Sequence, residues 1–233
     1  MTISLRPYQQ KTCDTIVDVI QDTAEKIASV PAQREKIVQK QGAVLLQAPT
    51  GSGKTLMLSR SLERVTGTLP MKTAWFWFAP FSGLVTQTED SIKAHAANLR
   101  VRDPKTERDA ALCEDGDVYV STWASVAAKN KDARKVRTDA EELPSIDTLI
   151  EALRADGWLI GAVIDEAHIN FGGSAKQALD FFINVLSPDF TLMATATPKD
   201  KQLKEFRDAA GIERVNQITV SRDEVVKAKL NKY

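Results

Sequence analysis

One stretch of the chain decides how the rest is interpreted: Ala43-Val-Leu-Leu-Gln-Ala-Pro-Thr-Gly-Ser-Gly-Lys-Thr55. Its first four residues are apolar and predict a short buried strand. A loop of small residues follows, in which Gly51 and Gly53 let the backbone approach a ligand without a Cβ clash. Lys54 and Thr55 then open an amphipathic segment. Backbone N–H groups in such a loop, with the amino terminus of the helix behind it, form a binding site for phosphate.

The loop follows the pattern A-x-x-G-x-G-K-T, in which Ala48 takes the place usually held by glycine. We expect Lys54 to reach the β- and γ-phosphates of a nucleoside triphosphate and the Thr55 hydroxyl to ligate Mg²⁺. Because strand, loop and helix occur in the order that this chemistry requires, we interpret the segment as a nucleotide site. The residues expected to contact the phosphates are Thr50, Gly51, Ser52, Gly53, Lys54 and Thr55.

A second apolar run ends in two adjacent carboxylates, in the sequence Leu159-Ile-Gly-Ala-Val-Ile-Asp-Glu-Ala-His168. Adjacent residues of a strand point to opposite faces, so the two carboxylates have different roles. Asp165 is expected to hold Mg²⁺ through its water shell, and Glu166 to polarise the water that attacks the γ-phosphate. A strand that ends in Asp-Glu is common by itself. Its place downstream of a phosphate loop makes Lys54, Asp165 and Glu166 the candidate catalytic residues.

A third apolar run, Phe190-Thr-Leu-Met-Ala-Thr-Ala-Thr-Pro198, ends in small hydroxyl residues. At the edge of the same crevice, Thr195 and Thr197 can hydrogen-bond the segment that carries His168. Such a contact would relay the state of the nucleotide to another surface. The alternative is structural: the threonines cap a strand, and Pro198 starts a turn before the next helix.

Composition limits the function classes without choosing one. The chain has 233 residues, with 31 Lys plus Arg and 31 Asp plus Glu, so its formal net charge is zero. Any contact with nucleic acid must therefore be local. Cys13 and Cys113 lack a metal-type spacing, and a reduced, cytoplasmic setting is expected. The richest apolar run, Ala74 to Phe81, is too short to cross a bilayer, so no membrane association is expected.

Apolar runs alternate with helical patterns along the chain. A leading amphipathic helix is expected over Tyr8–Val30, followed by a polar connection to Gln41. The alternation predicts an α/β fold, a mostly parallel sheet with helices on both faces, whose ligands gather at the carboxyl ends of the strands. Strands are expected over Ala43–Leu46, Thr73–Ala79, Val118–Ser121, Leu159–Ile164 and Phe190–Ala196, and helices near Thr55–Val65, Gly83–Ala97, Ser174–Leu186 and Lys201–Ala210.

Two segments of the chain are rich in charged residues and one is rich in aromatic residues. Arg100–Asp109 mixes signs and is expected to be a solvated surface loop. Lys129–Arg137 is mostly basic, and it is either a solvated face or a contact with a phosphate backbone. Trp75-Phe-Trp-Phe78 is continuous and lies upstream of a strand end, so we interpret it as a core strand rather than a platform for stacking bases.

The ordered set Ala48-Pro-Thr-Gly-Ser-Gly-Lys-Thr55, Asp165-Glu-Ala-His168 and Thr195-Ala-Thr-Pro198 resembles motifs I, II and III of superfamily 2 helicases and translocases. It looks most like the DEAH-type ATPase part of type I and type III restriction-endonuclease subunits. The resemblance implies a RecA-like P-loop NTPase fold, with ATP and Mg²⁺ as cofactors and DNA, rather than RNA, as the favoured partner. The implied setting is restriction or phage defence.

The same resemblance implies roles for residues outside the three motifs. Leu5-Arg-Pro-Tyr-Gln9 resembles the opening of such lobes, in which the glutamine reads adenine; this assigns Gln9 to the base, with Arg6 or Tyr8 nearby. Ala79-Pro80 with Leu84 and Gln87 resembles motif Ia, and Val118-Tyr-Val-Ser-Thr-Trp123 resembles a later motif that touches the nucleic-acid backbone. The candidate nucleic-acid contacts are Pro80, Ser82, Gly83 and Thr122.

The resemblance also predicts a domain organisation. Residues 1–41 would form the adenine-recognition helix and its connection, 42–220 the first RecA-like lobe, and 221–233 the start of a linker. In the family a second lobe carries motifs IV to VI and an arginine finger. We therefore expect a truncated form, a fragment or a subunit that depends on a partner, with very low ATP hydrolysis by the chain alone. The alternatives are a nucleotide-binding regulatory module and another P-loop ATPase, such as a kinase or chaperone-like enzyme, that acts on a protein.

Overall fold

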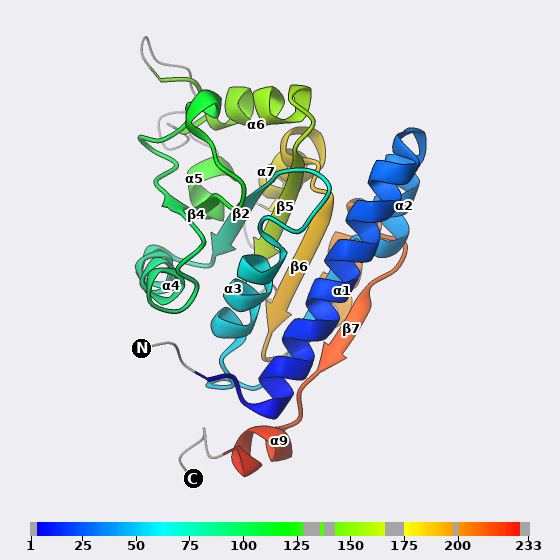
Figure 1. The fold of residues 1–233 in the computed structure, drawn as a ribbon, viewed down its shortest axis with the longest axis vertical. Coiled ribbons are helices and arrows are strands. Elements are labelled where there is room, and N and C mark those ends of the chain that lie inside the picture. Colours follow the sequence, from blue (N-terminus) through cyan, green and yellow to red (C-terminus); the bar gives the residue numbers. More distant parts are fainter. Residues whose placement is uncertain (1–3, 128–135, 138–142, 166–174, 198–199, 229–233) are drawn as a thin grey trace.

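The computed structural model describes residues 4–127, 136–137, 143–165, 175–197 and 200–228. Its strands form one seven-stranded sheet in the order β3-β4-β2-β5-β6-β1-β7, and every pairing between these strands is parallel (Figure 1). The predicted parallel α/β sheet is confirmed. The strands are β1 Ala43–Gln47, β2 Thr73–Ala79, β3 Val101–Arg102, β4 Val118–Thr122, β5 Leu159–Ile164, β6 Phe190–Thr195 and β7 Asn216–Thr219.

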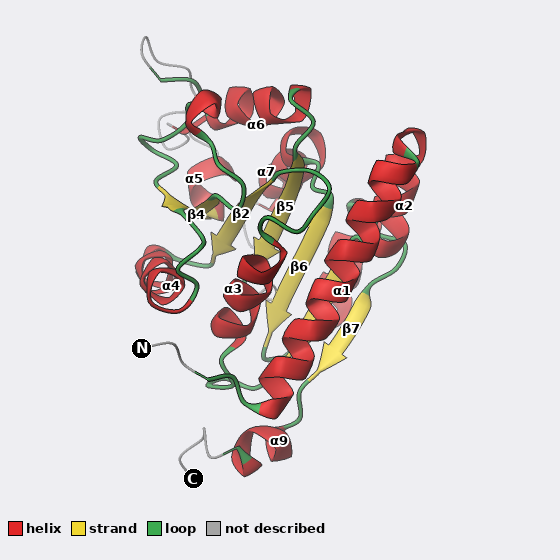
Figure 2. Ribbon diagram, viewed as in Figure 1, coloured by secondary structure: helices red, strands yellow, loops and turns green. Residues whose placement is uncertain are grey.

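Helices cover both faces of the sheet (Figure 2). Side chains of successive strand residues alternate between two apolar clusters: Val44 and Leu46 of β1 belong to one, Ala43 and Leu45 to the other. Helices α1, α3 and α4 pack on the first cluster, and α5, α6 and the α7–η4 unit on the second. The helices are α1 Pro7–Ser29, α2 Arg34–Gln41, α3 Lys54–Val65, α4 Ser82–His95, α5 Trp123–Ala127, α6 Ile146–Ala155, α7 Ala175–Asp180, the π-helix η4 Phe181–Leu186, α8 Asp200–Ala209 and α9 Arg222–Lys227, with short 3₁₀ turns at η1 Pro31–Gln33 and η2 Ala110–Leu112.

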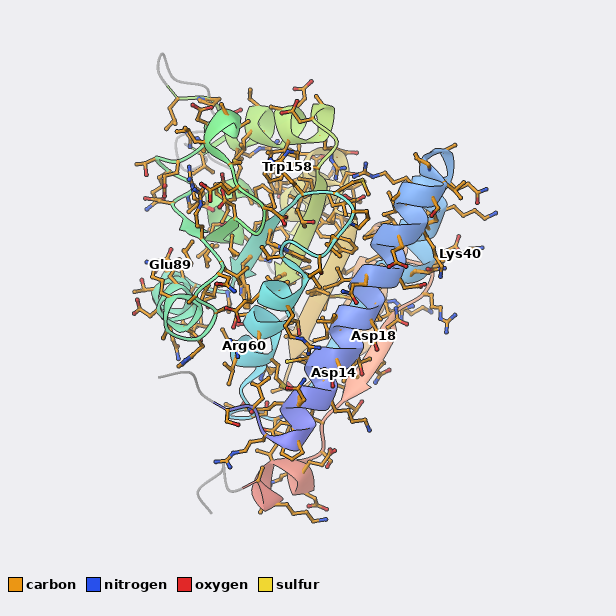
Figure 3. All side chains as sticks on the ribbon, viewed as in Figure 1. Asp14, Asp18, Lys40, Arg60, Glu89 and Trp158 are labelled. Carbon is orange, nitrogen blue, oxygen red and sulfur yellow. The ribbon has the colours of Figure 1, made fainter. Side chains whose placement is uncertain are left out.

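The amphipathic helix predicted over Tyr8–Val30 is present as α1, and it lies along α3 over much of its length. Ile16 and Ile20 of α1 are fully buried, whereas Asp14 and Asp18 lie toward its outer side (Figure 3). Asp14 accepts a hydrogen bond from Arg64 of α3 at 2.7 Å, and this bond lowers the pKa of the Asp14 carboxyl. The apolar side of α1 therefore fixes the amino-terminal segment to the helix that follows the phosphate loop.

The aromatic strand β2 is core, as predicted. Trp75, Phe76, Trp77 and Phe78 are all at most 1% exposed. Trp75 stacks on Phe190 with ring centroids 5.7 Å apart, while Phe76 faces the other layer and stacks on Tyr119 at 5.2 Å. Large rings on both faces of this interior strand supply much of the apolar surface that the two helical layers cover.

The polar segment after α1 contains a helix that the sequence analysis did not anticipate. Arg34 at the start of α2 donates two hydrogen bonds of 2.7 Å to Asp189, just before β6. Asp189 is almost fully buried and also accepts the backbone N–H of Ile160 at 2.8 Å. A bidentate ion pair between residues so distant in sequence stabilises a helix that its local sequence does not predict.

The expectation of a solvated loop over Arg100–Asp109 was wrong. Val101 and Arg102 form the edge strand β3, and the side chains of Arg102 and Arg108 are buried. Arg100 donates to both carboxylate oxygens of Asp117, at 2.7 and 2.9 Å, and these hydrogen bonds raise the pKa of Arg100. Arg102 and Arg108 of this segment are thus part of the packed structure, whereas Asp103, Lys105 and Asp109 are exposed.

Gly161 on β5 provides a test of the packing. The strand register places it opposite Trp75, and a Cβ at this position would lie 2.1 Å from the indole ring. We predict that Gly161→Ala lowers the free energy of unfolding by about 3 kcal/mol, because ring and strand cannot both stay in place. Chemical denaturation measures this, with Gly83→Ala as the control, since a Cβ there comes no nearer than 3.9 Å to another group. Equal stability of the two variants would contradict the described packing.

Candidate nucleotide site

Three of the predicted motifs reach the same edge of the sheet. Strand β6 lies between β1 and β5, and all three run parallel. The register pairs Gln47, the last residue of β1, with Thr195, and pairs Ile164, the last residue of β5, with Met193. The phosphate loop, Asp165 and Thr195 therefore follow neighbouring strands at the carboxyl edge, the lower end of the sheet in Figure 1.

The phosphate loop has a backbone that depends on glycine. Gly51 and Gly53 have φ angles of 79° and 86°, in the left-handed region that other residues avoid. Ser52 between them is fully buried, and its N–H donates to the carbonyl of Pro49 at 3.1 Å. Helix α3 begins at Lys54 directly after this turn, and no side chain of the described residues caps its amino terminus. Its first amides are thus placed where an anion would be stabilised.

Lys54 and Ala48 connect the loop to the neighbouring strand. The Lys54 side chain is mostly buried, and its Nζ donates to the Ala48 carbonyl at 3.3 Å. The N–H of Ala48 donates to the carbonyl of Thr195 at 3.1 Å, and the Thr195 hydroxyl accepts the N–H of Thr197 at 3.2 Å. The candidate phosphate lysine and the candidate coupling threonines therefore belong to one continuous hydrogen-bonded unit.

Asp165 directly follows β5 at the same edge. Its N–H donates to the carbonyl of Phe78 at 3.0 Å, and the residue is only 7% exposed. A buried carboxylate at a strand end, on the same edge of the sheet as a buried lysine, has the chemistry of a cation and phosphate site. Glu166 and His168 lie outside the described residues.

The amino-terminal segment also reaches the loop. Tyr8 Oη donates to the Ser52 carbonyl at 2.7 Å, and Gln9 Nε2 donates to the same oxygen at 3.0 Å. Gln9 Oε1 accepts the N–H of Arg6 at 2.9 Å, while the Arg6 side chain is exposed. The segment predicted to read the base thus touches the segment predicted to hold the phosphates.

The candidate nucleic-acid residues form a separate part of the same edge. Pro80, Ser82 and Gly83 follow β2, and Thr122 ends the adjacent β4, paired with Ala79. Phe81, which the sequence analysis did not single out, lies between Pro80 and Ser82 and is 57% exposed. Its position directly after Ala79-Pro80 at a strand end is the sequence signal that makes it a further candidate at this edge.

Of the basic run Lys129–Arg137, residues 129–135 lie outside the described ranges, and the end of the run lies within them. Arg137 makes an ion pair with Asp147 at 2.7 Å and lies 5.0 Å from the centroid of the Phe181 ring. Its guanidinium therefore holds the start of α6 against η4. Arg137 is neither a solvated cation nor one available to phosphate.

A cavity of about 370 Å³ lies at the opposite, amino-terminal edge of the sheet. Arg34 and Asp189 line it, together with Arg154, Phe182 and Ile212. None of the motif residues lines it, and the candidate site lies instead at the carboxyl edge, where the phosphate loop and Asp165 follow their strands. In the described part of the chain no helix is long and apolar enough to span a membrane.

Residues 2–200 match the family model described as type III restriction enzyme, res subunit. The chain belongs to this family. The match spans all three motifs and the amino-terminal segment, and it agrees with the resemblance to superfamily 2. No curated protein matches the chain.

Solved structures of helicases share the fold. The Pyrococcus furiosus Hef helicase domain has a TM-score of 0.51 and 21% identity, over 83% of this chain and 39% of that one. The Sulfolobus solfataricus SWI2/SNF2 ATPase core in complex with dsDNA has a TM-score of 0.54 and 15% identity, over 97% and 47%. The DUF1998 helicase MrfA bound to DNA has a TM-score of 0.51 and 15% identity, over 93% and 27%. The chain thus shares the RecA-like fold of these proteins and spans less than half of each of them.

Gly53 offers a test of the contact between loop and amino-terminal segment. A Cβ here would lie 2.7 Å from Gln9 Nε2, whereas Gly157, with a similar φ of 79°, has nothing within 4 Å. Both Ala variants carry the left-handed strain of about 1–2 kcal/mol, but only Gly53→Ala also displaces Gln9. We predict a larger loss of unfolding free energy for Gly53→Ala, and about tenfold weaker nucleotide binding from a shift near 1.4 kcal/mol. Denaturation and calorimetric titration measure both. Identical behaviour of the two variants would refute the contact.

Proposed function

We propose that the chain is the ATP-binding lobe of an ATP-dependent DNA helicase or translocase of a restriction or phage-defence system, and that it hydrolyses ATP only with a second lobe. The observation that carries the proposal is the arrangement of the phosphate loop, Asp165 and Thr195 on three adjacent parallel strand ends. Membership of the res-subunit family supports the restriction setting. A cytoplasmic location follows from that role.

Adenine recognition is assigned to Gln9, with Arg6 nearby. The carboxamide already donates one N–H to Ser52 and accepts one hydrogen bond from Arg6. It keeps one N–H and one lone pair for a ligand. Adenine offers N7 as acceptor and N6 as donor, which complements this pair, whereas guanine offers two acceptors, N7 and O6. A carboxamide held by the protein in this way favours ATP over GTP.

The residues present fit a magnesium-bound triphosphate. A Cβ at Gly51 or Gly53 would strain a loop whose turns both need left-handed backbone. Mg²⁺ binds through one or two protein oxygens together with phosphates and waters, so Thr55 and Asp165 suffice without a larger carboxylate cluster. When bound, the ion neutralises charge on the phosphates. The phosphate contacts come from Thr50, Gly51, Ser52, Gly53, Lys54 and Thr55.

Catalysis and coupling are assigned to groups around the triphosphate and its Mg²⁺ ion. Lys54 stabilises charge on the β- and γ-phosphates, and Glu166 polarises the attacking water. His168, Thr195 and Thr197 relay the state of the nucleotide to the nucleic-acid surface. The hydrogen bonds from Ala48 to Thr195 and from Lys54 to Ala48 support this relay, because they join the phosphate lysine to β6, the strand that lies between β1 and β5.

The proposed nucleic-acid contacts are Pro80, Ser82, Gly83 and Thr122, with Phe81 between them. Backbone amides, hydroxyls and an exposed ring hold sugar and phosphate without reading sequence. DNA is favoured over RNA, since two of the solved structures that share the fold contain DNA. We retain the division into residues 1–41, 42–220 and 221–233. Within the last part, Val225 of α9 is fully buried in the same core cluster as α1.

Separate variants distinguish binding from hydrolysis. We predict that Lys54→Ala weakens ATP binding about a hundredfold, from the loss of a buried charge-assisted contact of roughly 2–3 kcal/mol. Glu166→Gln should keep ATP binding and abolish turnover in the assembly that contains the second lobe. Fluorescent-nucleotide titration and phosphate release measure the two effects. Equal loss of binding in both variants would contradict the assigned roles.

The need for a second lobe gives a further prediction. An arginine finger contributes about 10³–10⁵ in rate. The purified 233-residue chain should therefore bind ATP but hydrolyse it slowly, with no increase on addition of double-stranded DNA. Steady-state phosphate release checks this. Strong stimulation by DNA in the chain alone would show that no partner lobe is required.

A further inference from the structure

The Tyr8 hydroxyl makes a contact that the nucleotide roles above do not use. It donates to the carbonyl oxygen of Ser52 at 2.7 Å, within the phosphate loop, and Tyr8 is only 7% exposed. Burial raises the pKa of Tyr8 above its ordinary value, so the hydroxyl remains a donor at neutral pH. The family resemblance assigned Tyr8 no more than a place near the base, yet its polar atom is bound to the loop.

The position of Tyr8 is fixed from behind by helix packing. Cys13, further along α1, donates from Sγ to the carbonyl of Met57 in α3 at 3.3 Å, and Ile16 is fully buried beside it. Helix α1 therefore cannot move away from α3 without breaking apolar contacts. The tyrosine hydroxyl is presented to the loop from a rigid support.

Because of the geometry of the peptide bond, this contact also fixes the direction of the Gly53 N–H. The Ser52–Gly53 peptide is trans and planar, so its C=O and N–H point in opposite directions. Two donors, Tyr8 Oη and Gln9 Nε2, hold the oxygen on the α1 side. The N–H of Gly53 must then point away from α1. Gly53 precedes the first residue of α3, where backbone amides meet a phosphate in sites of this kind.

Of the two donors, Tyr8 is the one with no role assigned toward the base, although its hydroxyl also interacts with the Gln9 side chain. Gln9 divides its carboxamide between Ser52, the N–H of Arg6 and, in the proposed function, adenine. A side chain that must adapt to an arriving base is a poor anchor for the loop. The shorter bond from Tyr8 does not depend on the base.

We propose that Tyr8 is a positioning residue of the phosphate loop: its hydroxyl holds the Ser52–Gly53 peptide so that the Gly53 N–H is presented to the β-phosphate. The inference rests on the proposed nucleotide site and adds a residue to it. Tyr8 acts through the loop backbone and not on the base.

The test compares a nucleotide with a ligand that has no base. Affinities for MgADP and for magnesium tripolyphosphate are measured by calorimetric titration on the 233-residue chain and on Tyr8→Phe. Loss of one buried hydrogen bond should weaken both ligands by about three- to tenfold. Tyr119→Phe is the matched control, because that hydroxyl is also buried and bonds to Cys113 Sγ at 3.1 Å on the other face of the sheet. It should bind both ligands like the wild type.

Each outcome has one meaning. Weakening of MgADP alone by Tyr8→Phe would assign Tyr8 to the base and overturn the inference. Unchanged affinities in Tyr8→Phe, with normal binding by the wild type, would also overturn it and leave the proposed function intact. If the folded wild type bound neither ligand, the nucleotide site itself would be refuted.

A second measurement needs no variant and covers the case in which Tyr8→Phe does not fold. The ¹⁵N–¹H resonance of Gly53 in the wild type should shift strongly on addition of magnesium tripolyphosphate, whereas that of Gly157, a left-handed glycine in another turn, should not. A Gly53 amide that is unaffected while neighbouring loop amides shift would show that this N–H does not face the phosphate.

Discussion

The parallel pairing of β1, β6 and β5 is the constraint on which the candidate site depends. Because side chains alternate between two packed clusters, a slip of one residue in any of these strands would move each side chain into the other cluster, where its size and shape do not match its neighbours. The packing of the core therefore fixes the register. Because the register is fixed, the residues that follow β1 and β5 lie at a fixed separation, with Thr195 between them. The strand register thus brings together the three distant parts of the sequence that form the candidate site.

The amino-terminal helix adds a second level of order. Strand ends alone fix where the phosphate loop starts, but the loop itself is a chain of small residues with few side-chain contacts of its own. Helix α1 supplies those contacts from outside through Tyr8 and Gln9, while its buried side chains hold it against α3. The loop is thus supported by the strand before it, the helix after it and a helix that precedes both in sequence.

Much of this architecture could be predicted from the sequence, and the failures have physical causes. Continuous apolar runs identified β2 and β5 with their observed bounds, and the glycine pattern identified the loop. The two-residue strand β3, the helix α2 and the buried state of Arg102 could not be predicted. Their stability comes from partners far away, such as Asp189 for Arg34, and a local window reports a charged residue without its partner. The contact of Tyr8 with Ser52 is of the same kind.

The arrangement of the indole rings has a practical consequence for spectroscopy. All four tryptophans are at most 6% exposed: Trp75 and Trp77 lie within β2, Trp123 begins α5, and Trp158 precedes β5. Their emission is set by the apolar interior and reports whether the two layers remain packed on the sheet. The ligand edge contributes at most through Trp123, next to Thr122, so intrinsic fluorescence follows unfolding well and nucleotide occupancy poorly.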